Sequence, residues 1–186
     1  MEVLFQSLSR DLWKQINDEV RACFKVGKER PTAAAVFYHL RSHKYLLITS
    51  TKGGLLNPGL VKGGVEGGEG AQEALMREIS QELRVPRHAI KIKGYGGSFE
   101  VPSNHEKGGC RIKRYFVFLV AYKGPHKLNI NGELSGSFWY PLDEIPGVLD
   151  IALRNHPHKL VVLKHVFASP SLKKAKAKRK KKITGR

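Results

Sequence analysis

Two glutamates four residues apart, Glu78 and Glu82, lie in a segment whose pattern predicts a helix over residues 71–83. At this spacing both carboxylates project from one helical face, and no lysine at i+4 neutralises either of them. Carboxylate oxygens are the ligands that Mg²⁺ and Mn²⁺ prefer, and such an ion often bridges protein carboxylates and substrate phosphates. The pair therefore fits a metal site for phosphate chemistry, although the same spacing also occurs on ordinary solvated helices.

A glycine-rich stretch precedes this helix and includes Gly63, Gly64, Gly67, Gly68 and Gly70. Glycine permits close approach of the backbone and dihedral angles that other residues disfavour. Backbone amides in such a loop, together with a helix N-terminus, can bind phosphate oxygens. The stretch and the helix together predict a site for a phosphate-bearing substrate and a divalent cation.

Residues 63–85 resemble the Nudix box, G-x5-E-x7-R-E-U-x-E-E-x-G-U, in which U is a bulky aliphatic residue. The positions that match this pattern are Gly63, Glu69, Arg77, Glu78, Ile79, Glu82 and Val85. Two positions depart from it. Gln81 replaces the first glutamate of the Glu-Glu pair and removes one negative charge from the implied metal site. Arg84 replaces a glycine that takes the left-handed conformation, which costs a residue with a side chain about 1 kcal/mol.

Nudix hydrolases cleave a pyrophosphate bond in a nucleoside diphosphate linked to another group, with Mg²⁺ or Mn²⁺ assisting the attack of water. The resemblance implies that Glu78 and Glu82 are metal ligands and that either also positions or deprotonates water. It implies that Gln81 is a weak metal ligand or a residue that contacts one of the ligands, and that the backbone of Gly63 lies near the metal.

The resemblance also assigns residues around the metal. Arg77 would pair with Glu69 and hold the glycine loop against the helix. Lys62 opens a Lys-Gly-Gly sequence similar to that of the diphosphoinositol phosphatase and dinucleoside polyphosphate branches, and it would bind substrate together with Gly64. A basic cluster lies around residues 104–109 and contains Lys107, Arg111, Lys113 and Arg114. We expect Lys107 and Arg111 to favour polyanionic substrates; an ordinary basic surface is the alternative.

Family members often take a further carboxylate from a loop beyond the box, and the candidates here are Glu100, Glu106 and Glu133. Glu133 precedes Trp139 by six residues, and the Pro-Leu-Asp-Glu-Ile sequence follows shortly after. This arrangement resembles the E…W-x-P-L-D-E-L segment of many Nudix domains. We therefore expect Glu133 to be the third catalytic carboxylate, with a solvated loop glutamate as the alternative.

The order of elements predicts an α+β fold. Apolar periodicity indicates helices over residues 8–24, 71–83 and 157–168 and strands over 32–40, 45–49, 90–92, 95–101, 111–122 and 137–140. This order agrees with the Nudix α/β/α sandwich around a mixed β-sheet, which the resemblance implies. We expect an N-terminal helical segment (residues 1–30) that packs on the domain, a Nudix domain (31–168) and a basic low-complexity tail (169–186).

The chain has 33 Lys and Arg against 16 Asp and Glu, a formal net charge of +17. Residues 171–186 contain nine basic residues and no acidic residue, a composition typical of a disordered segment. Such a tail could bind nucleic acid without sequence preference. A nuclear localisation signal, if the source is eukaryotic, and a solubilising tail are the other interpretations. No apolar run is long enough to span a membrane, and the N-terminus lacks a secretory signal, so we expect a cytoplasmic protein.

These observations predict a Nudix pyrophosphohydrolase that depends on Mg²⁺ or Mn²⁺. The expected substrate is a nucleotide or polyphosphate of the dinucleoside polyphosphate, diphosphoinositol or RNA 5′-pyrophosphate class. The rival hypothesis is a catalytically weak or inactive Nudix-like module that binds RNA or a nucleotide. The replacement at Gln81 and the basic tail favour the rival, and the presence of both Glu78 and Glu82 favours the enzyme. The sequence does not specify an oligomeric state.

Overall fold

The computed structural model describes residues 5–26, 29–51, 57–105, 109–154, 157–170 and 172. The elements in chain order are α1 (Arg10–Val26), β1 (Glu29–His39), β2 (Tyr45–Ser50), β3 (Pro58–Gly59), β4 (Val61–Gly64), α2 (Ala71–Leu83), a 3₁₀ turn (Arg87–Ala89), β5 (Ile90–His105), β6 (Gly109–Tyr122), β7 (Leu134–Tyr140), α3 (Ile145–Ala152) and α4 (Pro157–Phe167). No helix among these residues is long and apolar enough to cross a bilayer.

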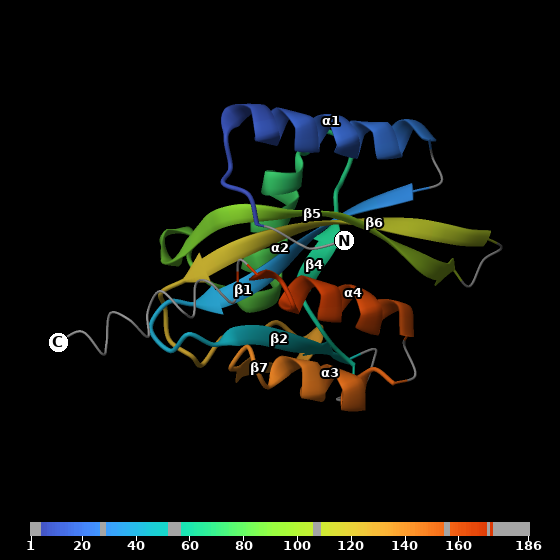
Figure 1. Cartoon of the computed structure of the whole chain (residues 1–186). Coiled ribbons are helices and arrows are strands. Elements are labelled where there is room, and N and C mark those ends of the chain that lie inside the picture. The colour runs from blue at the N-terminus through green and yellow to red at the C-terminus, as the bar shows by residue number, and fades with distance from the viewer. Residues whose placement is uncertain are drawn as a thin grey trace.

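The seven strands form one mixed sheet. Its main order is β3-β2-β1-β6-β5, with β4 paired to β1 and β7 paired to β2. β1 and β6 run parallel, and the other pairs are antiparallel. Helices α1 and α2 cover one face of the sheet and α3 and α4 the other (Figure 1). This arrangement is the α/β/α sandwich that the sequence predicts.

The central strand β1 is buried on both faces because its side chains alternate between two cores. Ala33, Ala35 and Phe37 pack with α1 and α2, whereas Ala34 and Val36 pack with α3 and α4. Such a strand shows a continuous apolar run rather than an alternating pattern. Residues 32–35 of β1 pair with β4 on one side and with β6 on the other, so β1 fixes the positions of both strands.

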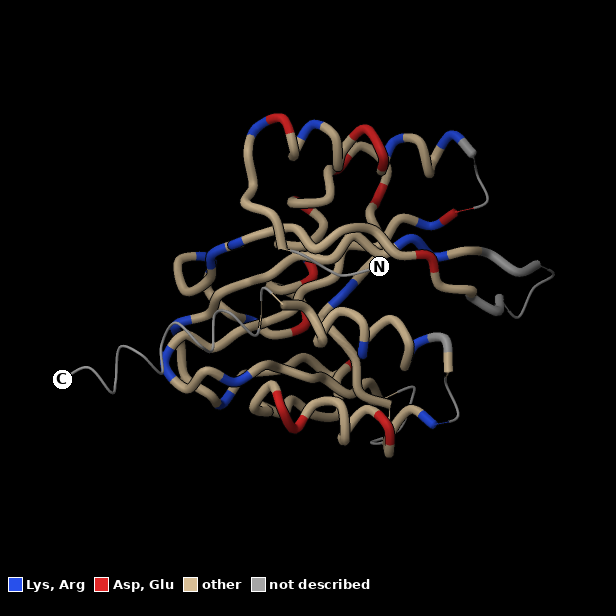
Figure 2. The backbone as a smooth tube through the Cα atoms, viewed as in Figure 1, with Lys and Arg blue, Asp and Glu red and all other residues tan. Residues whose placement is uncertain are grey.

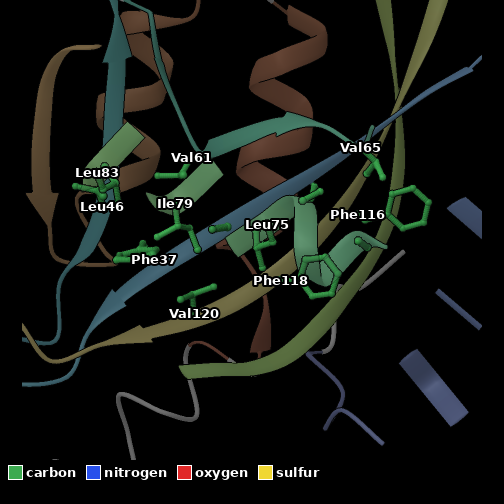
Figure 3. Packing of buried hydrophobic residues seen from close by; sticks show 14 of the residues in the cluster. Phe37, Leu46, Val61, Val65, Leu75, Ile79, Leu83, Phe116, Phe118 and Val120 are labelled. Atoms are coloured by element: carbon green, nitrogen blue, oxygen red, sulfur yellow. The ribbon is translucent and has the colours of Figure 1, made fainter. Parts of the chain in front are cut away.

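Helix α2 is anchored by an apolar stripe. Leu75, Ile79 and Leu83 are fully buried. They lie among apolar side chains of the sheet that include Phe37, Leu46, Val61 and Phe118 (Figure 3). Residues at i and i+4 share a helical face, so burial of this stripe sets the rotation of the helix about its axis. The carboxylates of the helix are thereby directed towards β4, which contacts α2 extensively.

Helix α1 packs on the same face through Ile16, Val20 and Cys23. The Ser9 hydroxyl accepts a hydrogen bond from the Leu12 amide at 3.1 Å and caps the start of the helix. Apolar residues four apart run through Ile16 and Val20 to Phe24, but the Phe24 side chain is 44% exposed. The real stripe drifts by a residue over this length because a helix has 3.6 residues per turn rather than four.

Several elements differ from the sequence prediction because tertiary pairing overrides local composition. β3 and β4 are strands inside the glycine-rich region, where a loop was expected. The runs at residues 90–92 and 95–101 form one strand, β5, with register shifts. Helix α3 was not predicted, since Pro146 and Gly147 look like turn residues in the sequence. Pro146 lies in the first turn of α3, where a missing N–H costs nothing.

Arg84 ends α2 in the left-handed conformation, with φ 49° and ψ 34°, and its amide bonds to the Ser80 carbonyl at 3.1 Å. Arg84 therefore adopts the left-handed conformation that the Nudix pattern assigns to a glycine at this position. We expect Arg84→Gly to raise the free energy of unfolding by up to about 1 kcal/mol, because glycine adopts this conformation without steric cost. Urea unfolding measures the change. Arg84→Ala keeps the side-chain clash and should show no such gain; an equal gain in both variants would contradict the explanation.

Candidate active site

A cavity of ≈ 330 Å³ opens between β2, β4, the loop before β7 and α4. Four charged side chains line it: Glu82, Glu133, Lys62 and Lys159. They come from four separate parts of the chain, namely α2, the segment between β6 and β7, β4 and α4. The cavity therefore combines two carboxylates with two ammonium groups, an arrangement suited to metal ions and phosphates together.

Glu82 is the most perturbed carboxylate at this cavity. The Lys62 backbone amide hydrogen-bonds to its carboxyl group. Its Oε2 atom is shielded from solvent and has no hydrogen-bond partner among the described residues. Burial raises the pKa of Glu82 to about 7; the Lys62 charge opposes this rise, and the charges of Glu78 and Glu133 add to it. A buried carboxylate oxygen without a partner is costly unless a ligand or cation satisfies it.

Glu78 packs directly on the backbone of β4. A Cβ atom added to Gly63 would lie 1.8 Å from the Glu78 carboxyl carbon, far inside contact distance. Arg77 Nη1 donates to Glu78 Oε1 at 2.5 Å and holds this carboxylate from the other side. Gly63 is therefore required by close approach, as the sequence predicted for the glycine loop.

Arg77 links the glycine loop to the helix. Its Nη2 donates to Glu69 Oε1 at 2.6 Å and to the Gly64 carbonyl at 2.8 Å. The Glu66 amide donates to the same Glu69 oxygen at 2.7 Å. Hydrogen bonds from Arg77 hold the pKa of Glu69 below its usual range. This geometry agrees with the structural role that the resemblance implies for Glu69 and Arg77.

Gln81 lies on the exposed side of α2. Its amide oxygen accepts a hydrogen bond from Arg77 Nη1 at 3.4 Å. The amide is therefore directed to the arginine that also holds Glu78, and not to the described lining of the cavity. Because Gln81 contacts the arginine that holds Glu78, its position suits a residue that orients a metal ligand rather than one that coordinates the metal itself.

Glu133 reaches the cavity because its loop is tied to neighbouring elements. The Asn131 amide donates to the Glu82 carbonyl at 3.0 Å, and Thr51 donates from its amide to the Glu133 carbonyl at 3.0 Å. Of the rival carboxylates, Glu100 pairs with Arg114 at 2.5 Å, away from the cavity. Glu106 lies outside the described residues.

The predicted basic cluster is divided between the two faces of the sheet. Arg114 forms ion pairs with Glu19, Glu29 and Glu100 on the α1 side. Lys113, one residue earlier in β6, points to the opposite face because strand side chains alternate. Lys107 and the side chain of Arg111 lie outside the described residues. Figure 2 shows acidic and basic positions interspersed along α1, so this helix presents no uniformly basic surface.

Lys159 is a cavity residue that the sequence did not single out. Its Nζ donates to the side chain and, at 3.4 Å, to the carbonyl of Asn57, and it lies 3.3 Å from the Cβ position of Gly59. Burial, together with the nearby charge of Lys62, lowers the pKa of Lys159 to about 8. A lysine in a predicted amphipathic helix carries no signal of this kind, since only the packing of α4 places it at the cavity.

The carboxylates do not form a closed metal centre by themselves. Within the part of the chain that the structure describes, no group of three or more His, Cys, Asp or Glu residues is close enough to hold an ion. The unpartnered Oε2 of Glu82 nevertheless fits a cation, and Glu133 across the same cavity supplies oxygen ligands of the type that Mg²⁺ and Mn²⁺ prefer. The remaining ligands would come from water and substrate phosphate, as is usual for Mg²⁺.

Comparison with known proteins identifies the family. The model of the NUDIX domain matches residues 29–163, which is most of the chain. The chain belongs to the Nudix hydrolase family. Its members generally use divalent metal ions and act on nucleotide or polyphosphate substrates, and this chain is accordingly a hydrolase.

Several solved Nudix structures share the fold. The dihydroneopterin triphosphate pyrophosphohydrolase of E. coli superposes with a TM-score of 0.56 at 18% identity, covering 66% of this chain and 85% of that one. A NUDIX hydrolase from Nitrosomonas europaea gives 0.54 at 20% identity, covering 76% and 90%. An Ap4A hydrolase of C. elegans gives 0.52 at 16% identity, covering 72% and 96%. No curated protein sequence matches the chain.

The perturbed carboxyl of Glu82 predicts how stability depends on pH. Burial raises the pKa of Glu82 from 4.5 to about 7 in the folded, metal-free protein, so the folded state binds a proton more tightly than the unfolded state does. The resulting stabilisation is complete below about pH 4.5 and is lost as pH rises through about 7. We expect urea unfolding in EDTA to show this decline between pH 5 and pH 8, and Glu82→Gln to remove it. An unchanged pH profile in the variant would show that another group titrates.

Proposed function

We propose that the protein hydrolyses a pyrophosphate bond in a nucleoside diphosphate-X or related polyphosphate substrate and that it requires Mg²⁺ or Mn²⁺. The observation that carries this proposal is the partly buried Glu82 carboxyl, which has an unpartnered oxygen and belongs to a residue that lines a cavity with Glu133 and two lysines. Such a mixture of charges suits a metal–phosphate complex, because the carboxylates hold the cation and the ammonium groups neutralise the phosphates.

The residues divide the work of the reaction. A bound divalent ion would supply charge stabilisation to the phosphates and acidify a water molecule. Glu82 and Glu78 would hold that ion, and Arg77 would fix the direction of the Glu78 carboxylate. Glu133 lies across the cavity and would accept a proton from the attacking water. The water oxygen forms a bond to one phosphorus as the P–O bond of the bridging oxygen breaks, and Lys62 offsets the charge on the leaving phosphate.

The names of two structural neighbours support the substrate class. They are a dihydroneopterin triphosphate pyrophosphohydrolase and an Ap4A hydrolase, which both act on phosphate anhydrides. The test is a hydrolysis panel with Mg²⁺ and Mn²⁺ that contains nucleoside triphosphates, ADP-ribose, dinucleoside polyphosphates, diphosphoinositols and 5′-triphosphate RNA. Turnover of one class by the wild-type protein supports the proposal. A folded protein that turns over none of them with either metal would contradict it.

The rival function, binding of RNA or a nucleotide without turnover, depends on the basic tail, which lies outside the described residues apart from its beginning. It predicts RNA affinity that falls steeply with salt. Deletion of residues 173–186 should then abolish the affinity without changing hydrolysis. A silent hydrolysis panel combined with this salt dependence would favour the binding module over the enzyme.

A further inference from the structure

Four basic side chains on one face of the sheet are more than the hydrolysis of a single pyrophosphate requires. They are Arg30 of β1, Lys62 of β4, Lys113 of β6 and Lys159 of α4, and we call them the cation row. β1 lies between the two other strands and connects their positions: Arg30 pairs with Lys113 across β1 and β6, and Ala34 pairs with Lys62 across β1 and β4. Three adjacent strands thus contribute a cation each.

The alternation of strand side chains places all three on the α3–α4 face. Ala34 and Val117 belong to the core on that face, and Arg30 and Lys113 each lie an even number of residues from them. Lys62 lines a small recess together with Ala34, Val117 and Lys159, which fixes its direction. Gly64 lies two residues after Lys62 in β4 and so faces the same side of the sheet. A Cβ atom added to Gly64 would lie 3.0 Å from the Arg30 guanidinium, which places Arg30 on this face as well.

Lys159 completes the row from above the sheet. It is shared by the recess under α4 and by the cavity that contains Glu82 and Glu133. The row therefore begins at the candidate active site and continues along β1 to Arg30. At about 3.3 Å per residue, the four residues from Ala34 to Arg30 span roughly 13 Å, more than a single phosphate group needs.

The cations of the row form no close ion pair with a described carboxylate, although the charge of Lys62 acts on Glu82. In the described part of the chain, no ion pair joins any of them to an acidic residue, whereas Arg114 on the other face has three and Lys164 of α4 pairs with Asp150. Lys62, Lys113 and Lys159 are also partly buried. Burial and the neighbouring charges of Lys62 and Arg30 lower the pKa of Lys113. Placing like charges together in a partly desolvated position is unfavourable, and a bound polyanion would offset that cost.

We propose that the cation row binds a linear chain of phosphates that extends beyond the bond to be cleaved, so that the substrate carries three or more consecutive phosphate groups. This proposal rests on the proposed function and narrows it. Nucleoside triphosphates and dinucleoside polyphosphates fit the row, whereas a diphosphate that ends in an uncharged sugar leaves most of it without a partner. Lys159 and Lys113 are then residues that select for phosphate-chain length.

The first test compares two substrates that share a pyrophosphate, diadenosine tetraphosphate and ADP-ribose. We expect Lys159→Gln to lower kcat/KM for the tetraphosphate about tenfold more than kcat/KM for ADP-ribose, with the difference mainly in KM. Lys159→Arg keeps the charge and should restore the tetraphosphate reaction. Lys164→Gln removes the same charge from the same helix outside the cavity and serves as the matched control.

Lys113→Gln gives an independent result, because Lys113 lies on β6 and does not contact Asn57 as Lys159 does. It should show the same preference for loss on the longer substrate. Equal losses on both substrates, or no loss on either, would overturn the proposal. So would a loss of the same size in Lys164→Gln, since charge alone and not the row would then explain it.

A binding measurement separates this proposal from the proposed function. Titration calorimetry of the metal-free protein should show tripolyphosphate bound at least about tenfold more tightly than pyrophosphate, with the difference lost in Lys159→Gln. If no substrate is hydrolysed but this difference is present, the hydrolase proposal fails and the cation row stands. If hydrolysis is present and tripolyphosphate shows no advantage, the cation row fails and the hydrolase proposal stands.

Discussion

Replacing Glu82 by glutamine should lower kcat by about 10³-fold while leaving the fold intact. The Lys62 backbone amide of β4 donates a hydrogen bond to this carboxylate, and its buried Oε2 has no partner among the described residues. Glutamine preserves the volume but removes the charge that would hold the cation. The measurement is steady-state hydrolysis of the best substrate at saturating Mg²⁺, with far-UV circular dichroism to check the fold.

Stability supplies the second half of this prediction. A partly buried carboxylate is costly, so Glu82→Gln should not lower the free energy of unfolding of the metal-free protein at pH 8. Glu144→Gln is a suitable control, because Glu144 is exposed just before α3 and lies outside the cavity. A variant at Glu82 that keeps wild-type kcat would remove this residue from the catalytic machinery.

Substituting Gly63 by alanine should cause a second large loss. The new Cβ would overlap the Glu78 carboxyl carbon at 1.8 Å and its oxygens at 1.9 and 2.3 Å. Either Glu78 leaves its place beside Arg77 or β4 moves away from α2, and both changes disturb the site. We expect activity to fall by about 10²-fold or more and the free energy of unfolding to fall by about 1–3 kcal/mol. Hydrolysis assays and urea unfolding measure the two effects.

Two further variants isolate the cause. Gly67→Ala makes the same substitution nearby, where nothing lies within 4 Å of the new Cβ, and should behave like the wild type. The double variant Gly63→Ala/Glu78→Ala removes the overlap, so it should recover stability without recovering activity. Recovery of neither, with a normal Gly67→Ala, would show that Gly63 is needed for something other than room for Glu78.

Both predictions depend on how α2 meets β4. The apolar stripe of Leu75, Ile79 and Leu83 buries one side of the helix, and the charged side therefore lies along the edge of β4. Arg77 then connects Glu69, Glu78 and the Gly64 carbonyl, so the loop and helix behave as one rigid unit. A rigid unit is what a metal–phosphate site requires, because small displacements of its ligands reduce catalysis strongly.

The sequence by itself determined the parts of the protein that depend on local spacing. Glu78 and Glu82 share a helical face because 3.6 residues make one turn, and the same periodicity located α2 within its observed ends. The fixed positions of the Nudix box identified the family, and the strain at Arg84 followed from the conformational cost of a side chain at a helix end. These inferences need only short-range geometry, which the order of residues specifies.

Only the tertiary structure decided what depends on contacts between distant segments. Strand alternation turns Arg114 towards α1 and Lys113 towards α4, although both belong to one basic run. Lys159 reaches the cavity because α4 packs on the same face of the sheet as α3, and Glu133 reaches it because Asn131 is tied to the end of α2. Sequence spacing carries no information about such contacts, because they arise from burial of apolar faces brought together across the whole chain. The carboxylate helix and Lys62 were therefore predictable, whereas the position of Lys159 at the cavity was not.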